Sequence, residues 1–178
     1  MTTDTTQFID GLGLPPRLLE RAELLALVEH VAERRELWTP HLNTDAGERT
    51  YAALHRDPNV DVWAIFWLPE NDTGWHDHDT SSGAVRVVSG ALEEHALLLA
   101  RPERRTCHRG GEAFSFGPSR IHRLTCAEPR AVSIHAYSPP LWRLGQYTVD
   151  DEGVLHRVSV SYADELRPLE PTALSVAA

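Results

Sequence analysis

Two histidines separated by one aspartate, His76 and His78 in the segment GWHDHDTSSG (74–83), have a spacing suited to binding a metal ion. On an extended segment, residues two apart point to the same face, so both imidazoles would converge on one point while Asp77 faces away. The alternative interpretation is a pair of surface histidines in a polar loop. A third ligand elsewhere in the chain would favour the metal site.

A third histidine, His122, follows a Gly-Pro turn in the segment FGPSRIHRLTC, at the expected start of a strand. Three neutral imidazoles are a known ligand set, and divalent iron, nickel, copper and zinc all accept them. Three protein ligands also leave coordination positions open, as catalytic sites require. The sequence therefore predicts a metal site at His76, His78 and His122, without selecting the metal.

The segment RAVSIHAYSPPL (130–141) alternates between polar and apolar residues. Ser133, His135 and Tyr137 share one face of the expected strand. The apolar residues of the other face are Val132, Ile134 and Ala136. If this strand lines a barrel with its polar face inward, that face needs hydrogen-bonding partners or a ligand, because unpaired polar groups are costly to bury. The alternative is a strand whose polar face is exposed to solvent.

The elements that must position these residues are one helix and a series of strands. Leucines and valines repeat every three to four residues over 15–38, which predicts a helix opened by two prolines and stopped near Thr39-Pro40. Short β-rich runs follow from about residue 49, and such a series predicts a mainly β sandwich or barrel. The expected strands are 60–68, 84–100, 112–117, 122–127, 130–138, 145–150 and 154–162.

Composition narrows the classes of partner. The net charge of −9 argues against nucleic acid or an anionic membrane as a partner. The chain has no apolar run of the ~18 residues that a membrane span needs, and the N-terminus lacks the features of a signal peptide. Cys107 and Cys126 are the only cysteines, so a disulfide framework is not expected. We expect a cytoplasmic protein, a monomer, that acts on a small molecule.

The histidine spacings resemble the two motifs of the cupin superfamily. In the first motif an HxH pair is followed by a glutamate ligand and a glycine. Here His76 and His78 are followed by Gly83 at the glutamate position and then by Gly90. The residues at positions of the second motif are Gly111, Gly117, Ser119, His122 and Cys126. The resemblance implies a cupin barrel, a double-stranded β-helix or jelly roll.

The same resemblance implies one domain in three parts. Residues 49–166 would form the cupin barrel, and residues 1–48 would form a helical segment packed on it. Residues 167–178 would be a loosely held C-terminal tail.

Loss of the glutamate and the segment SIHAYSPPL resemble the cysteine dioxygenase branch of the cupins. That branch oxidises the sulfur of a small thiol, cysteine above all, to a sulfinate with O2 at a non-haem Fe(II) ion. The resemblance implies that His76, His78 and His122 hold the iron. In the branch, the tyrosine can be cross-linked to a cysteine at the position of Gly83, so this chain cannot form that thioether.

The resemblance also implies catalytic roles for Ser133, His135 and Tyr137. Tyr137 would donate a hydrogen bond toward the bound oxygen or the substrate carboxylate, and His135 would orient Tyr137. Ser133 would fix the tautomer of His135.

The substrate-binding residues depart from the family pattern. In the family, an arginine two residues after a tyrosine at the barrel entrance holds the substrate carboxylate. The stretch RTYAALHRD retains the tyrosine as Tyr51 but has Ala53 at the arginine position. Arg56 is the predicted substitute, and its alternative interpretation is a solvated loop arginine. The departure leaves open whether the substrate is cysteine or another small thiol.

Two other functions stay open. The first is a cupin enzyme that uses nickel or another metal for a different oxidation of a cysteine-like thiol. The second is a metal-binding sensory cupin without catalysis. The combination of three histidines with the series Ser133, His135 and Tyr137 argues against the second, because a binding protein has no need of that series.

Overall fold

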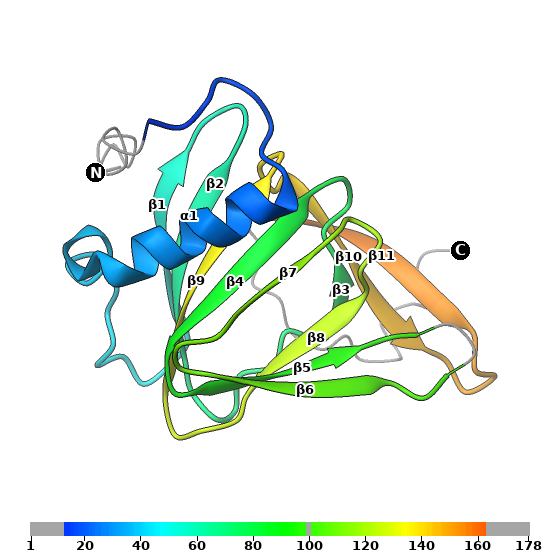
Figure 1. Cartoon of the computed structure of the whole chain (residues 1–178). Helices are drawn as coiled ribbons and strands as arrows, with labels where there is room; N and C mark the ends of the chain where they lie inside the picture. The colour runs from blue at the N-terminus through cyan, green and yellow to red at the C-terminus, as the bar shows by residue number, and fades with distance from the viewer. Residues whose placement is uncertain (1–12, 99–100, 163–178) are drawn as a thin grey trace.

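The computed structural model, which describes residues 13–98 and 101–162, is a barrel of two antiparallel sheets (Figure 1). The first sheet has the spatial order β1 (Thr50–Arg56), β2 (Asp61–Trp67), β9 (Ala131–Ser138), β4 (Ser82–Ser89) and β7 (Ala113–Phe116). The second has the order β11 (Leu155–Ser161), β10 (Arg143–Val149), β3 (Trp75–Asp77), β8 (His122–Cys126), β5 (Ala91–Ala96) and β6 (Arg104–Arg109). This arrangement confirms the predicted mainly β, jelly-roll fold of the cupins.

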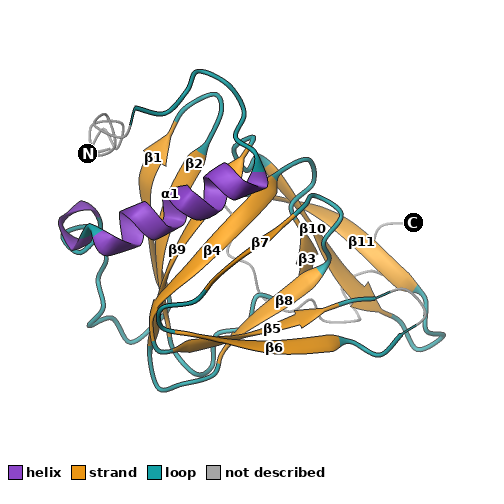
Figure 2. Cartoon of the chain, in the orientation of Figure 1, coloured by secondary structure: helices purple, strands orange, loops and turns teal. Residues whose placement is uncertain are grey.

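One α-helix, α1 (Arg21–Glu33), crosses the outer face of the first sheet (Figure 2). It is shorter than the predicted helix over 15–38. The chain before it is held away from helical geometry, because the backbone N–H of Leu19 donates to the Ser138 hydroxyl in β9 at 2.9 Å. The helix then begins at a capping box formed by Glu20 and Glu23. A short 3₁₀ helix, η2 (Arg35–Leu37), follows it.

The helix explains the alternation seen in β9. Val132, Ile134 and Ala136 belong to the same apolar core as Leu24 and Val28 of α1. All eight residues of β9 are buried, so neither face of the strand is exposed to solvent. The apolar face packs under the helix, and burying each side chain of this size contributes about 1.5–3 kcal/mol. The polar face is therefore left to line the interior of the barrel.

Strand boundaries differ from the sequence prediction where the chain turns sharply. The expected strand 84–100 is two strands, β4 and β5, separated at Gly90. Gly90 has φ of 71°, and a Cβ there would lie 2.1 Å from the carbonyl oxygen of Arg130. Only glycine fits this close approach. The sequence analysis also missed β1, β3 and β6.

Three further expectations from the sequence concern the chain termini, the cysteines and membrane-spanning segments. The predicted C-terminal tail, 167–178, and the first 12 residues of the predicted N-terminal segment lie outside the described residues. Cys107 and Cys126 are free thiols. In the part of the chain that the structure describes, no helix is long and apolar enough to cross a membrane.

Candidate active site

Three buried histidines meet on the inner face of the second sheet. His76 lies in β3 and is in register with His122, the first residue of the neighbouring strand β8, and His78 follows β3 directly. The exposed fractions are 3% for His76, 1% for His78 and 0% for His122. The ring centroids of the three histidines lie 4.8–5.0 Å apart. One ligand nitrogen from each lies within 4.8 Å of the other two. The structure thus brings together the three predicted ligands.

The hydrogen bonds of two of these histidines fit a metal ion. His76 Nδ1 lies 3.0 Å from the carbonyl oxygen of Gly74, and His122 Nδ1 lies 2.9 Å from Glu94 Oε1. Because a carbonyl or carboxylate oxygen only accepts, each Nδ1 carries the proton and each Nε2 keeps its lone pair. His122 Nε2 is buried and has no hydrogen-bond partner among the described residues. A buried nitrogen without a partner is expected of a ligand that awaits a cation.

Burial keeps all three imidazoles neutral. Burial, and secondarily the neighbouring His122, lowers the pKa of His76 to about 3. Burial also lowers the pKa of His78 well below its ordinary value, and it lowers the pKa of His122 despite the opposing hydrogen bond to Glu94. Neutral imidazole is the form that binds metals. The site therefore needs no proton release from its ligands near neutral pH.

Asp77 points away from the histidines, as the alternation of an extended strand requires. Its carboxylate accepts from Arg157 at 2.8 and 3.0 Å, from the backbone N–H of Gly145 at 3.0 Å and from the hydroxyl of Tyr147. These partners lie in β10 and β11. Asp77 therefore fixes the short strand β3 to the rest of the second sheet from the side opposite the site.

A chain of hydrogen bonds runs along the polar face of β9. Trp67 Nε1 donates to Ser133 Oγ at 2.8 Å, Ser133 Oγ lies 2.7 Å from His135 Nε2, and His135 Nδ1 lies 3.1 Å from the Tyr137 hydroxyl. Since Trp67 is only a donor, the Ser133 proton finds its acceptor, among the described residues, in His135 Nε2. The Nδ1 proton of His135 then points to the Tyr137 oxygen, and the Tyr137 O–H is free to donate into the cavity.

The pKa shifts of His135 and Tyr137 agree with this direction of hydrogen-bond donation, from Ser133 to His135 and from His135 to Tyr137. Burial lowers the pKa of His135 to about 3, so the ring is neutral and carries a single N–H. Burial, together with the charge of Asp61, raises the pKa of Tyr137 above its ordinary value. Tyr137 is therefore a protonated phenol at neutral pH.

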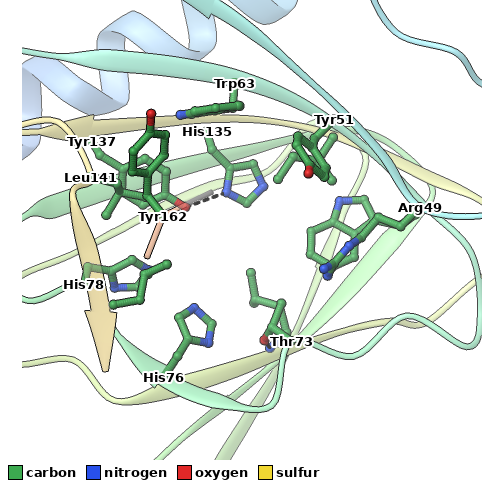
Figure 3. A pocket seen from close by; sticks show the side chains of 14 residues that line it. Arg49, Tyr51, Trp63, Thr73, His76, His78, His135, Tyr137, Leu141 and Tyr162 are labelled. Carbon is green, nitrogen blue, oxygen red and sulfur yellow. Dashed lines mark hydrogen bonds between the residues drawn. The ribbon is translucent and has the colours of Figure 1, made fainter. Parts of the chain in front are cut away.

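His76, His78, His135 and Tyr137 face one cavity of about 110 Å³ between the two sheets. Figure 3 shows His76 and His78 on one side, His135 and Tyr137 beside them, and Arg49 with Tyr51 on the side away from His78. The remaining walls are formed by Trp63, Ile65, Trp67, Thr73, Leu124, Leu141, Leu144 and Tyr162. The walls are thus largely apolar, with polar groups at the two ends.

Of the two predicted substrate-binding residues, the structure brings only Tyr51 into the cavity. Arg56 is not among the lining residues. Its guanidinium donates to the Leu141 carbonyl at 2.7 Å and lies 4.5 Å and 4.1 Å from the rings of Trp142 and Tyr162. These contacts place its charge behind the cavity wall.

The arginine that lines the cavity is Arg49, whose guanidinium lies 5.5 Å from the ring centre of Trp67. Arg49 directly precedes β1, two residues before Tyr51, and both residues line the cavity. The sequence therefore contains an arginine two residues from the tyrosine, but this arginine precedes the tyrosine, whereas in the family pattern it follows.

Phe116 occupies the space that a larger residue at position 83 would need. Gly83 is paired with Phe116 between β4 and β7, and a Cβ on Gly83 would lie 2.5 Å from the Phe116 ring. The Phe116 ring lies 4.6 Å from the rings of His78 and His122. A side chain at position 83, where the sequence already lacks the glutamate ligand, would thus overlap the Phe116 ring, a contact that the sequence did not reveal.

Comparison with known families and structures adds independent findings. A family model described as cysteine dioxygenase type I matches residues 17–150. Among solved structures, the chain is similar to KdgF from Halomonas sp., with 19% identity, a TM-score of 0.45, and 56% of this chain and 93% of that chain covered. A conserved protein with a double-stranded β-helix domain from Klebsiella pneumoniae has 17% identity, a TM-score of 0.49, and 56% and 80% covered.

Proposed function

The chain belongs to the cysteine dioxygenase type I family, and from this premise we propose that it is a non-haem Fe(II)-dependent dioxygenase that oxidises the sulfur of a small thiol to a sulfinate with O2. The observation that carries the proposal is the shared cavity. His76, His78 and the protonated Tyr137 line the same space of about 110 Å³. His122 completes the histidine cluster, with one ligand nitrogen within 4.8 Å of those of His76 and His78. The volume suits a molecule of a few heavy atoms.

Three protein residues would hold the metal, namely His76, His78 and His122. When bound, an Fe(II) ion would supply Lewis acidity toward the thiol and a redox-active centre through which the four electrons lost by sulfur reduce O2. None of the three ligands carries negative charge, so the site favours an anionic thiolate over a neutral thiol. Tyr137 donates its O–H toward the reacting groups, and the apolar walls exclude water from them.

Arg49 favours a thiol that also carries a carboxylate, such as cysteine or 3-mercaptopropionate. A guanidinium pairs well with a carboxylate, and it lies in the cavity with the histidines. The described lining residues include no aspartate or glutamate that would pair with a substrate amine. We therefore propose a small thiol carboxylate as the substrate class, which includes cysteine.

The direct test is anaerobic reconstitution with iron(II), followed by O2 consumption with cysteine, 3-mercaptopropionate and cysteamine in parallel. We expect uptake with at least one thiol carboxylate, little with cysteamine, and a product heavier by two oxygen atoms. Tyr137→Phe should lower turnover while leaving the bound iron unchanged. Stoichiometric iron without O2 uptake would favour a binding protein, and activity with nickel alone would favour a different metalloenzyme.

A further inference from the structure

Glu94 places a buried carboxylate directly behind the third histidine. It lies in β5, which pairs with β8, and its side chain is on the same face of the sheet as His122. Glu94 is 3% exposed, and its Oε1 lies 2.9 Å from His122 Nδ1. No sequence pattern distinguishes this residue from Glu93, its neighbour in the same strand.

The surroundings of Glu94 keep it ionised. Arg120 donates to its carboxylate from Nε at 3.2 Å and from Nη2 at 3.1 Å, and His108 Nε2 lies 3.6 Å from Oε2. Glu94 is therefore a carboxylate that can only accept hydrogen bonds.

His122 is alone among the three histidines in having a charged partner. His76 Nδ1 is paired with the neutral carbonyl of Gly74, and His78 Nδ1 has no hydrogen-bond partner among the described residues. Among the three predicted ligands, only His122 is therefore hydrogen-bonded to a negatively charged group, the Glu94 carboxylate. A carboxylate in this position raises the basicity of the ligand and fixes its tautomer.

We propose that Glu94 is a positioning residue of the metal centre, which orients His122 and lends the three neutral ligands a negative charge one hydrogen bond away from the metal. The inference rests on the proposed metal-dependent function. In this proposal Glu94, which does not bind the metal itself, supplies the negative charge that a glutamate ligand at position 83 would otherwise bring. Arg120 in turn holds Glu94 in place through hydrogen bonds to both of its carboxylate oxygens.

The test measures affinity for Co(II) alone, by competition with a chelator, with no thiol and no turnover. Glu94→Gln keeps an acceptor but removes the charge, and Glu94→Ala removes both. We expect affinity to fall about 10-fold for the first and about 100-fold for the second, in the range known for partners of metal-bound histidines. The visible absorption bands of bound Co(II) should shift in Glu94→Gln. Glu93→Gln, on the opposite face of the same strand, is the matched control and should bind as wild type does.

Thermal unfolding of the metal-free variants separates positioning from loss of structure. If Glu94→Gln does not fold, the double variant Glu94→Gln/Arg120→Gln removes both members of the buried ion pair and should show the same loss of affinity. Wild-type affinity and unshifted bands in folded Glu94 variants would overturn the proposal while leaving the dioxygenase function intact. A wild-type protein that binds Co(II) but oxidises no thiol would overturn that function and leave the role of Glu94 standing.

Discussion

Arg49 and Tyr51 lie two residues apart at the start of β1, and both line the cavity. Arg49 is the only lysine or arginine among the described residues of that lining. Arg49→Gln should raise the KM for cysteine and 3-mercaptopropionate by about 10- to 100-fold, because a hydrogen bond to a charged group contributes about 1.5–3 kcal/mol. The KM for cysteamine, which has no carboxylate, should stay unchanged.

The control for this prediction is Arg56→Gln, since Arg56 is the substitute that the sequence favoured. Its guanidinium is already engaged by Leu141, Trp142 and Tyr162. Steady-state kinetics of both variants decide between the two arginines. A raised KM in Arg56→Gln together with wild-type kinetics in Arg49→Gln would mean that Arg56, not Arg49, binds the substrate carboxylate.

Gly83 and Phe116 form a complementary pair behind the histidines. Gly83→Glu should destabilise the fold by about 1–3 kcal/mol because the new side chain overlaps the Phe116 ring. Phe116→Ala should also destabilise it, by about 3–5 kcal/mol, because it leaves a cavity. In the double variant each change relieves the other, so its loss should be smaller than the sum of the two. Urea denaturation of the four proteins measures this coupling, and strictly additive losses would contradict it.

At the scale of secondary structure, the short strand β3 depends on Asp77. With only three residues, β3 has few backbone hydrogen bonds of its own, and Asp77 connects it to Arg157 in β11 and to Gly145 in β10. Asp77→Ala should lower the free energy of unfolding by about 1–3 kcal/mol, less than for a fully buried ion pair because Arg157 is partly exposed. It should also weaken metal binding, since the flanking histidines lose their support. Chemical denaturation and Co(II) titration check both effects, and Asp151→Ala, at an exposed position in the turn between β10 and β11, is the control.

The strand pattern set the limit of what the sequence could predict. His76, His78 and His122 were recognised because their spacing follows the alternation of strands and a Gly-Pro turn, which are local signals. Glu94 was not recognised, because its contact with His122 depends on the register of β5 on β8, which no local pattern encodes. Arg49 lies two residues from Tyr51, but it was not recognised because the family pattern places the arginine after the tyrosine. The three residues of β3 are too few for any periodicity.

On the scale of the whole molecule, the two sheets contribute different halves of the site. His76 and His122 belong to the second sheet, and His78 directly follows its strand β3. Ser133, His135, Tyr137 and Tyr51 belong to the first sheet, and Arg49 directly precedes its strand β1. One of the connections between the two sheets runs from β9 to β10, near Leu141. This connection therefore affects how the two halves face one another across the cavity.

Asp61 holds this connection, and its ionisation should make the stability of the molecule depend on pH. Its carboxylate accepts from the backbone N–H of Leu141 at 3.1 Å and lies 3.4 Å from Arg56 Nη1. Burial raises the pKa of Asp61 to about 7, against the opposing charge of Arg56. The folded state therefore retains a proton that the unfolded state has lost. Between about pH 4 and pH 7, this group should reduce stability by at most about 1.4 kcal/mol per pH unit as pH rises.

Asp61→Asn removes this dependence while keeping an oxygen that accepts from Leu141. The difference in unfolding free energy between wild type and Asp61→Asn should shift in favour of the variant from pH 5 to pH 7 and become constant above about pH 8. Urea denaturation at each pH measures the difference. Asp77→Asn is the matched control, because hydrogen bonds from Arg157 and Tyr147 outweigh burial and lower the pKa of Asp77 to about 2. Its difference from wild type should stay constant over the same interval. A constant difference for Asp61→Asn as well would mean that Asp61 is ionised in the folded protein throughout, paired with Arg56.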